Sequence, residues 1–191
     1  MVAIDNTTLA LLLHPKAKPP IDPQTKLPLE KCKERIEQLI LDLDAGNERV
    51  VIPTPVLSEF LILAGKEGPE YLEKIQAAKT LLLRPFDERA AIELAAMELS
   101  DRGKGGKKAG SDAPYQKIKF DRQIVAVAKV NGAHTLYSDD DDVRKFATKA
   151  GIKVVSTWEL AIPPSKTPLL DILDDLPEST TAPHDGKKKS Q

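Results

Sequence analysis

The chain has 191 residues, 41 % of them hydrophobic, and a formal net charge of −1. This length and composition suit one compact domain, and the near-zero net charge excludes binding of a polyanion through overall charge alone. A single cysteine, Cys32, excludes an intramolecular disulfide and a Cys/His metal cluster. No stretch approaches the roughly 20 apolar residues that span a bilayer, and the N-terminus lacks the basic segment of an export signal. We therefore expect a cytoplasmic protein that makes no use of a membrane.

The first half of the sequence predicts strands that alternate with helices. Residues 2–5 have the character of a buried strand that ends at Asp5, and a helix over residues 7–13 follows. Five prolines predict an extended loop over residues 14–29. The next elements expected are a helix over residues 29–44, a strand over 49–52, an apolar helix from Pro53 to Gly65, a short helix over 69–78 and a strand over 80–84.

The second half continues the alternation. It predicts a helix over residues 87–101, a basic loop over 102–113, a helix over 114–130, a strand over 133–138, a helix over 142–150 and a strand over 152–156. Strands separated by helices are typical of an α/β fold with a parallel sheet. Prolines and a terminal lysine cluster then predict a flexible C-terminal tail over residues 161–191.

Acidic residues follow two of the predicted strands. Asp5 ends the first strand, and a run of four aspartates, residues 139–142, follows the fourth. Ligands of an open parallel sheet collect beyond the carboxyl ends of its strands, so these acids are candidates for a site. Two other interpretations stay open: Asp5 caps the next helix, and the aspartate run is a solvated helix start.

Two further acids interrupt apolar helical faces. Glu59 lies within VLSEFLIL and Asp121 within KIKFDRQIVAV, so helical periodicity places both beside the core. A buried carboxylate needs a cation or hydrogen bonds. In one interpretation a neighbouring Lys or Arg pairs with Glu59, and Arg84 or Arg122 with Asp121; in the other a divalent metal serves both. Oxygen ligands without His or Cys point to Mg²⁺ or Mn²⁺.

Taken in order, these segments resemble the PIN-domain family over residues 1–160. The matching segments are AIDNTTL, IPTPVLSEFL, RPFDERAAIELAAM, KIKFDRQIVAVAKVNGAHTLYSDDDDV and GIKVVSTWEL. The resemblance implies a three-layer α/β/α sandwich around a central parallel sheet of four to five strands. Haloacid-dehalogenase-like phosphatases fit less well because they need a second aspartate where this chain has Thr7, and GKGGKKAGS lies between helices rather than after a strand as a P-loop requires.

The resemblance also implies a set of site residues. In the family pattern a Ser or Thr precedes the fourth acid by two residues, which selects Asp140 after Ser138, with Asp139 as the alternative. Asp142 takes the place of a further metal-site acid, and Ser138 is the hydroxyl beside the cluster. The implied catalytic and metal-binding acids are Asp5, Glu59, Asp121 and Asp140.

Family members are typically Mg²⁺- or Mn²⁺-dependent ribonucleases, and many are VapC-like toxins held in check by an antitoxin. The resemblance therefore implies an RNA substrate, a cognate antitoxin protein and a homodimer. We expect basic residues to guide the RNA backbone, although a solvated loop explains most of them equally well. An RNA-processing nuclease without an antitoxin and a catalytically silent RNA- or protein-binding module are the alternatives. The candidate RNA-binding residues are Lys104, Lys107, Lys108, Lys117 and Lys119.

Overall fold

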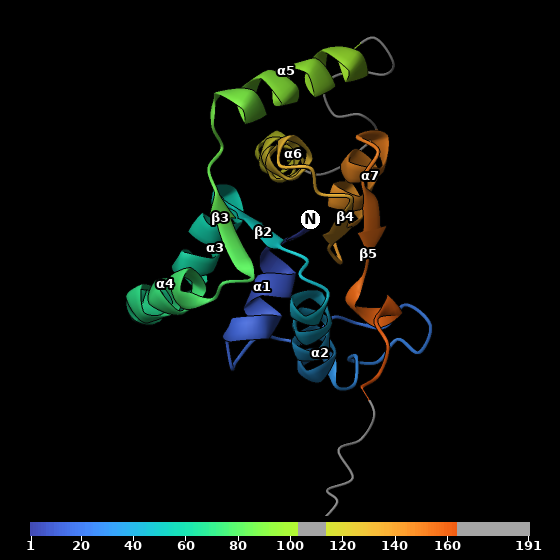
Figure 1. The fold of residues 1–191 in the computed structure, drawn as a ribbon. Coiled ribbons are helices and arrows are strands. Elements are labelled where there is room, and N and C mark those ends of the chain that lie inside the picture. Colours follow the sequence, from blue (N-terminus) through green and yellow to red (C-terminus); the bar gives the residue numbers. More distant parts are fainter. Residues whose placement is uncertain (103–113, 164–191) are drawn as a thin grey trace, which may run out of the picture.

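The computed structural model of the protein describes residues 1–102 and 114–163. Their strands form one five-stranded sheet in the order β3-β2-β1-β4-β5, and every neighbouring pair is parallel (Figure 1). The predicted parallel sheet of four to five strands is confirmed. The strands are β1 (Val2–Ile4), β2 (Val50–Pro53), β3 (Leu81–Arg84), β4 (Thr135–Tyr137) and β5 (Lys153–Val155).

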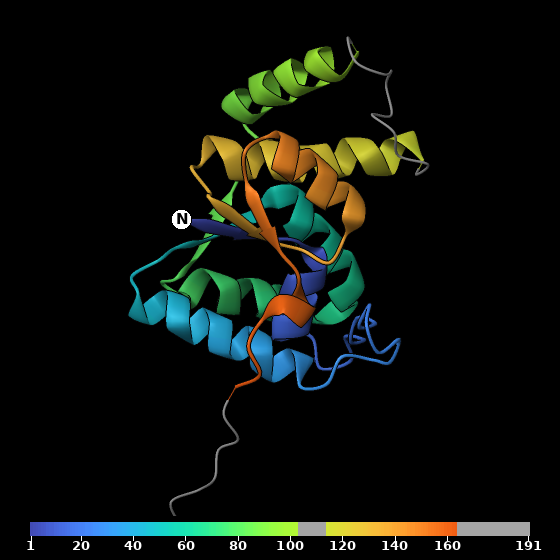
Figure 2. The same cartoon turned by 90° about the vertical axis from the view of Figure 1, so that its right-hand side faces the viewer.

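Helices cover both faces of the sheet, as a three-layer α/β/α sandwich requires. Figure 2 shows α5, α6 and α7 on one side of the strands and α1, α2 and α4 on the other. The helices are α1 (Asn6–Leu13), α2 (Cys32–Ala45), α3 (Thr54–Ala64), α4 (Gly68–Ala77), α5 (Glu88–Arg102), α6 (Tyr115–Val130) and α7 (Asp141–Lys149).

The core is divided by the sheet into two halves. Ala3, Val51 and Leu136 pack with α5, α6 and α7, whereas Ile4 and Ile52, which follow Ala3 and Val51 in the chain, pack with α1, α3 and α4. Successive strand residues point to opposite faces, so a strand covered on both sides is apolar at every position. This explains why the strands appear in the sequence as short continuous apolar runs.

The chain changes direction across the sheet at β1. It adds β2 and β3 on one side of β1 and later adds β4 and β5 on the other side. Helices that follow β1 and β4 therefore leave the sheet in opposite directions, and ligands of open α/β sheets typically bind at the carboxyl ends of two such strands. Asp5 follows β1 and Ser138 follows β4, so both lie at this position.

Several boundaries differ from those predicted. The helix predicted over residues 29–44 begins at Cys32, because Leu29 is buried outside the helix and Lys31 adopts a left-handed conformation with φ 51°. Two short 3-10 helices, η1 (Gly65–Glu67) and η2 (Thr157–Glu159), were not predicted. Residues 103–113 of the basic loop and residues 164–191 of the tail lie outside the described residues. Within the described residues, no helix has the length and apolar character needed to cross a membrane.

Candidate metal centre

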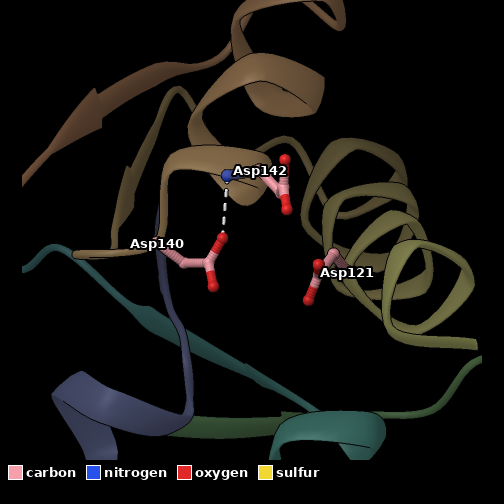
Figure 3. Close-up of side chains that lie close together, drawn as sticks. All are labelled: Asp121, Asp140 and Asp142. Atoms are coloured by element: carbon pink, nitrogen blue, oxygen red, sulfur yellow. Dashed lines mark hydrogen bonds between the residues drawn. The ribbon is translucent and has the colours of Figure 1, made fainter. Parts of the chain in front are cut away.

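Three carboxylates from α6 and from the start of α7 converge beyond the sheet. Asp121 comes from α6, Asp140 directly precedes α7, and Asp142 is in the first turn of α7 (Figure 3). One carboxylate oxygen from each residue lies within 4.8 Å of the others. This spacing allows all three side chains to contact a single cation.

The fold uses one oxygen of Asp140 and leaves the other for the cluster. Asp140 caps α7, because its Oδ1 accepts the backbone N–H groups of Asp142 at 2.8 Å and Val143 at 3.2 Å. Burial alone would raise the pKa of Asp140, but the hydrogen bond from Lys117 and the two backbone N–H groups outweigh it and lower the pKa. Asp140 is therefore held as a carboxylate with its Oδ2 facing the cluster.

Asp121 is in a less favourable environment for a charge. It is 7 % exposed on the buried side of α6. Burial raises its pKa to about 6, and the charges of Asp140 and Asp142 act in the same direction, while Lys117 opposes them only in part. The fold thus places a carboxylate where a nearby positive charge is needed to keep it ionised.

Lys117 supplies that positive charge. Its Nζ lies 2.7 Å from Asp140, 3.2 Å from Asp121 and 3.6 Å from Asp142. Burial lowers the pKa of Lys117, but the hydrogen bond to Asp140 and the charge of Asp121 outweigh it and raise the pKa. The sequence left the ion-pair partner of Asp121 open. In the structure Lys117, one helical turn earlier on α6, is such a partner.

Asp5 lies outside this set of three but is connected to it through Ser138. The Ser138 hydroxyl donates to Asp5 Oδ2 at 2.6 Å and accepts the backbone N–H of Asp140 at 3.1 Å. Asp5 also accepts the N–H of Thr8 at 2.8 Å and caps α1, as one interpretation of the sequence predicted. Burial raises the pKa of Asp5 to about 6, although these hydrogen bonds oppose the shift.

Glu59 belongs to α3 and lies outside the set of three. Its side chain is partly buried, and burial raises its pKa. The positive charge of Lys117 opposes this shift and the negative charge of Asp140 adds to it, which indicates that Glu59 lies within their electrostatic range. Three of the predicted acids thus contact Lys117, Glu59 lies within its electrostatic range, and Asp5 is linked to the cluster through Ser138.

The structure distinguishes the two aspartates that the sequence left as alternatives. Asp139 binds η2, which follows β5. Its carboxylate accepts hydrogen bonds from the backbone N–H of Thr157 at 2.6 Å and from the Thr157 hydroxyl at 2.8 Å. Asp140, not Asp139, lies beside Asp121 and Asp142. No local pattern in the sequence indicated this contact, because Thr157 belongs to the unpredicted η2.

The predicted RNA-binding lysines lie in three different situations. Lys104, Lys107 and Lys108 fall outside the described residues. Lys119 is exposed on α6, and Lys117 contacts the carboxylates. The exposed position of Lys119 is compatible with a role in RNA binding, which stays a prediction for all five residues.

The donor set fits a divalent metal ion. All three converging groups are carboxylates, the ligands that Mg²⁺ and Mn²⁺ prefer, and a lysine ammonium already lies among them as a monovalent cation. Backbone hydrogen bonds to Oδ1 fix the orientation of Asp140, and the neighbouring charge of Lys117 fixes that of Asp121.

Solved structures of other proteins have a similar fold. The chain aligns with a chain in the crystal structure of VapBC2 from Rickettsia felis bound to a DNA fragment from their promoter, at 16 % identity and a TM-score of 0.51, over 82 % of this chain and 98 % of that one. A chain of DNA-bound VapBC from Salmonella typhimurium aligns at 19 % identity and a TM-score of 0.49, over 82 % and 99 % of the two chains. No curated protein matches the sequence.

The family match covers most of the domain. The PIN domain matches residues 29–149, which include Glu59, Asp121, Asp140 and Asp142 but not Asp5. This range is well over half of the chain, and the α/β/α architecture agrees with it. The chain belongs to the PIN domain family, a family of nucleases.

Proposed function

We propose that the protein is a divalent-metal-dependent endoribonuclease whose site is formed by Asp121, Asp140 and Asp142 with Asp5 and Glu59 beside them. The observation that carries this proposal is the convergence of three carboxylates within 4.8 Å at the carboxyl end of the sheet. Parallel α/β proteins bind their ligands at this end of the sheet. Membership of a nuclease family supports the same conclusion.

The ligand chemistry supports Mg²⁺ or Mn²⁺. Both are hard cations that bind carboxylate oxygens, and the described residues of the cluster include no His or Cys. Bound there, such an ion supplies an activated water and stabilises negative charge on the phosphate and on the leaving oxygen.

The chain's own residues orient the ligands. The cap on α7 fixes Asp140 with one oxygen turned to the cluster, and the Ser138 hydroxyl holds Asp5 beside it. Asp121 is fixed by its buried position on α6. In this proposal Glu59 of α3 also contributes to the site, which its electrostatic interaction with Lys117 and Asp140 supports.

In this proposal, Lys119 of α6 and the lysines that precede α6 in the sequence guide the RNA. Lys119 lies on the exposed side of α6, two residues before Asp121. Lys104, Lys107 and Lys108 precede α6 in the sequence, and with Lys119 they give this region an excess of positive charge. Such charges attract the phosphate backbone independently of base sequence.

We further propose that the protein is the toxin of a toxin–antitoxin pair, acts in the cytoplasm as a homodimer and is inhibited by a cognate antitoxin. The fold shared with a chain of the VapBC2 structure supports this proposal. Expression of the chain alone tests it. Growth arrest that Asp121→Asn relieves is expected, whereas harmless expression of an active nuclease would indicate an RNA-processing enzyme without an antitoxin.

RNA cleavage tests the enzymatic proposal. Purified protein incubated with total RNA should cut it in Mg²⁺ or Mn²⁺ and not in EDTA, and Asp121→Asn should abolish cleavage. Asp141→Asn is a matched control, because Asp141 belongs to the same aspartate run but is exposed and lies outside the cluster. Cleavage that persists in Asp121→Asn would contradict the assignment, and absence of cleavage and of metal binding would indicate a silent binding module.

A further inference from the structure

The ammonium of Lys117 occupies the place among the carboxylates where a cation is expected. It is within 4.0 Å of all three acids of the cluster, and its shortest contact, 2.7 Å, is to the Asp140 oxygen that the α7 cap leaves available. The Lys117 ammonium, with a single positive charge, thus contacts all three carboxylates of the set that fits a divalent ion.

The helix that carries Lys117 does not account for this position. Lys117 is in the first turn of α6, where the partial positive charge of the helix N-terminus disfavours a cation, and this turn contains no acidic residue. A lysine four residues before an aspartate is also the weaker of the two possible orders of a helical ion pair. Attraction by Asp140 and Asp142, which come from the start of α7, is what holds the ammonium in place.

Lys117 is the main positive charge that the described residues bring to the cluster. Lys145 also reaches Asp142, at 3.4 Å, but its side chain is half exposed and Asp142 is the only one of these three described acids that it contacts. Three carboxylates and the Lys117 ammonium leave a net charge of −2, which becomes −3 when the ammonium withdraws. Withdrawal therefore increases the attraction of the cluster for a divalent ion.

We propose that Lys117 is an intramolecular counter-ion that competes with the divalent metal for Asp121, Asp140 and Asp142 and has to withdraw before the metal binds. The inference rests on the proposed metal site. Lysine suits this role, because its charge is compact and its four-carbon chain is flexible. Its side chain is 44 % exposed, so the ammonium has a route to solvent without movement of α6.

Two effects follow from this competition. The metal-free protein gains stability, because the ammonium relieves repulsion among carboxylates that cannot separate. The same ammonium weakens metal binding, because its contacts have to be broken first. Lys117 is thus a residue that sets the affinity for metal rather than a ligand of it.

Calorimetric titration with Mn²⁺ tests the proposal. Lys117→Met and Lys117→Gln remove the charge and should each bind Mn²⁺ about tenfold more tightly than the wild type, equal to about 1.4 kcal/mol. Lys117→Arg keeps the charge and should bind weakly, like the wild type. Lys119→Met is the matched control, because it removes an exposed charge from the same helix, and solvent screens that charge.

A second readout, urea unfolding in EDTA, does not depend on metal affinity. In EDTA, Lys117→Gln should unfold at a lower urea concentration than the wild type. When Mn²⁺ is added, it should stabilise this variant more than the wild type, because the variant binds the ion more tightly. Unchanged or weaker Mn²⁺ binding by both neutral variants, with normal binding by the wild type, would overturn this inference alone. Failure of all proteins to bind Mn²⁺ would overturn the metal site as well.

Discussion

Replacement of Asp5 by asparagine should stabilise the metal-free protein at neutral pH. Asp5 is 4 % exposed, and its burial raises its pKa from 3.8 to about 6. Asparagine has almost the same shape, still caps α1 through its side-chain oxygen, and carries no charge. The substitution therefore removes the electrostatic penalty while it keeps most of the local hydrogen bonds.

The size of the effect follows from the change in pKa. Each pKa unit corresponds to about 1.4 kcal/mol, so the shift from 3.8 to about 6 amounts to about 3 kcal/mol. Because the folded protein binds this proton more tightly than the unfolded chain does, the free energy of unfolding falls as the pH rises from about 4 to above 6. The Asp5→Asn variant avoids this loss, so its advantage is small near pH 4, grows as the pH rises and reaches its full size above pH 6.

Urea unfolding in EDTA at pH 4.5 and pH 7.5 measures this difference. EDTA keeps divalent ions away from the carboxylates, and the raised pKa of Asp121 is common to both proteins and cancels. Asp141→Asn removes an exposed carboxylate and is the control. A variant at Asp5 that is less stable than the wild type at pH 7.5, or a difference that does not change with pH, would refute the reasoning.

Two further substitutions test how the site is positioned. Ser138→Ala removes the donor to Asp5 and the acceptor for the Asp140 N–H, so urea unfolding should show a loss of about 1 to 3 kcal/mol; an unchanged midpoint would contradict a positioning role. Asp139→Ala removes the acceptor for Thr157 and should lower stability by a similar amount while Mn²⁺ affinity is kept. Asp140→Ala should instead abolish Mn²⁺ binding in the same calorimetric assay, and the opposite pattern would assign the metal-site role to Asp139.

The sheet and most helices were predictable because local pattern and tertiary packing agree. Strands buried on both faces produced short apolar runs, and helix starts carried suitable residues, such as Pro55 near the start of α3. The start of α2 was not predictable, because Leu29 continues the apolar periodicity while the left-handed conformation of Lys31 separates it from the helix. Tertiary burial of Leu29 decided this boundary.

The candidate site was predictable to a different extent for each residue. Asp121 and Glu59 stood out because a carboxylate on an apolar helical face needs a partner. The orientation of Asp139 depends on η2, 18 residues later in the chain, which no local pattern predicts, whereas the cap on α7 orients Asp140. In the sequence, Lys117 resembled the other basic surface residues. Only its spacing of four residues from Asp121 indicated that the two side chains could meet.

A crystal of the intact protein soaked in Mn²⁺ tests the central claim, a divalent-metal site among Asp121, Asp140 and Asp142, most directly. Anomalous scattering locates Mn²⁺ without any assumption about activity. We expect one strong peak between these three carboxylates, at ligand distances of about 2.1 to 2.3 Å, with the Lys117 ammonium displaced towards solvent. Absence of a peak at saturating Mn²⁺, or a peak elsewhere with Lys117 still in contact with the three acids, would contradict the account.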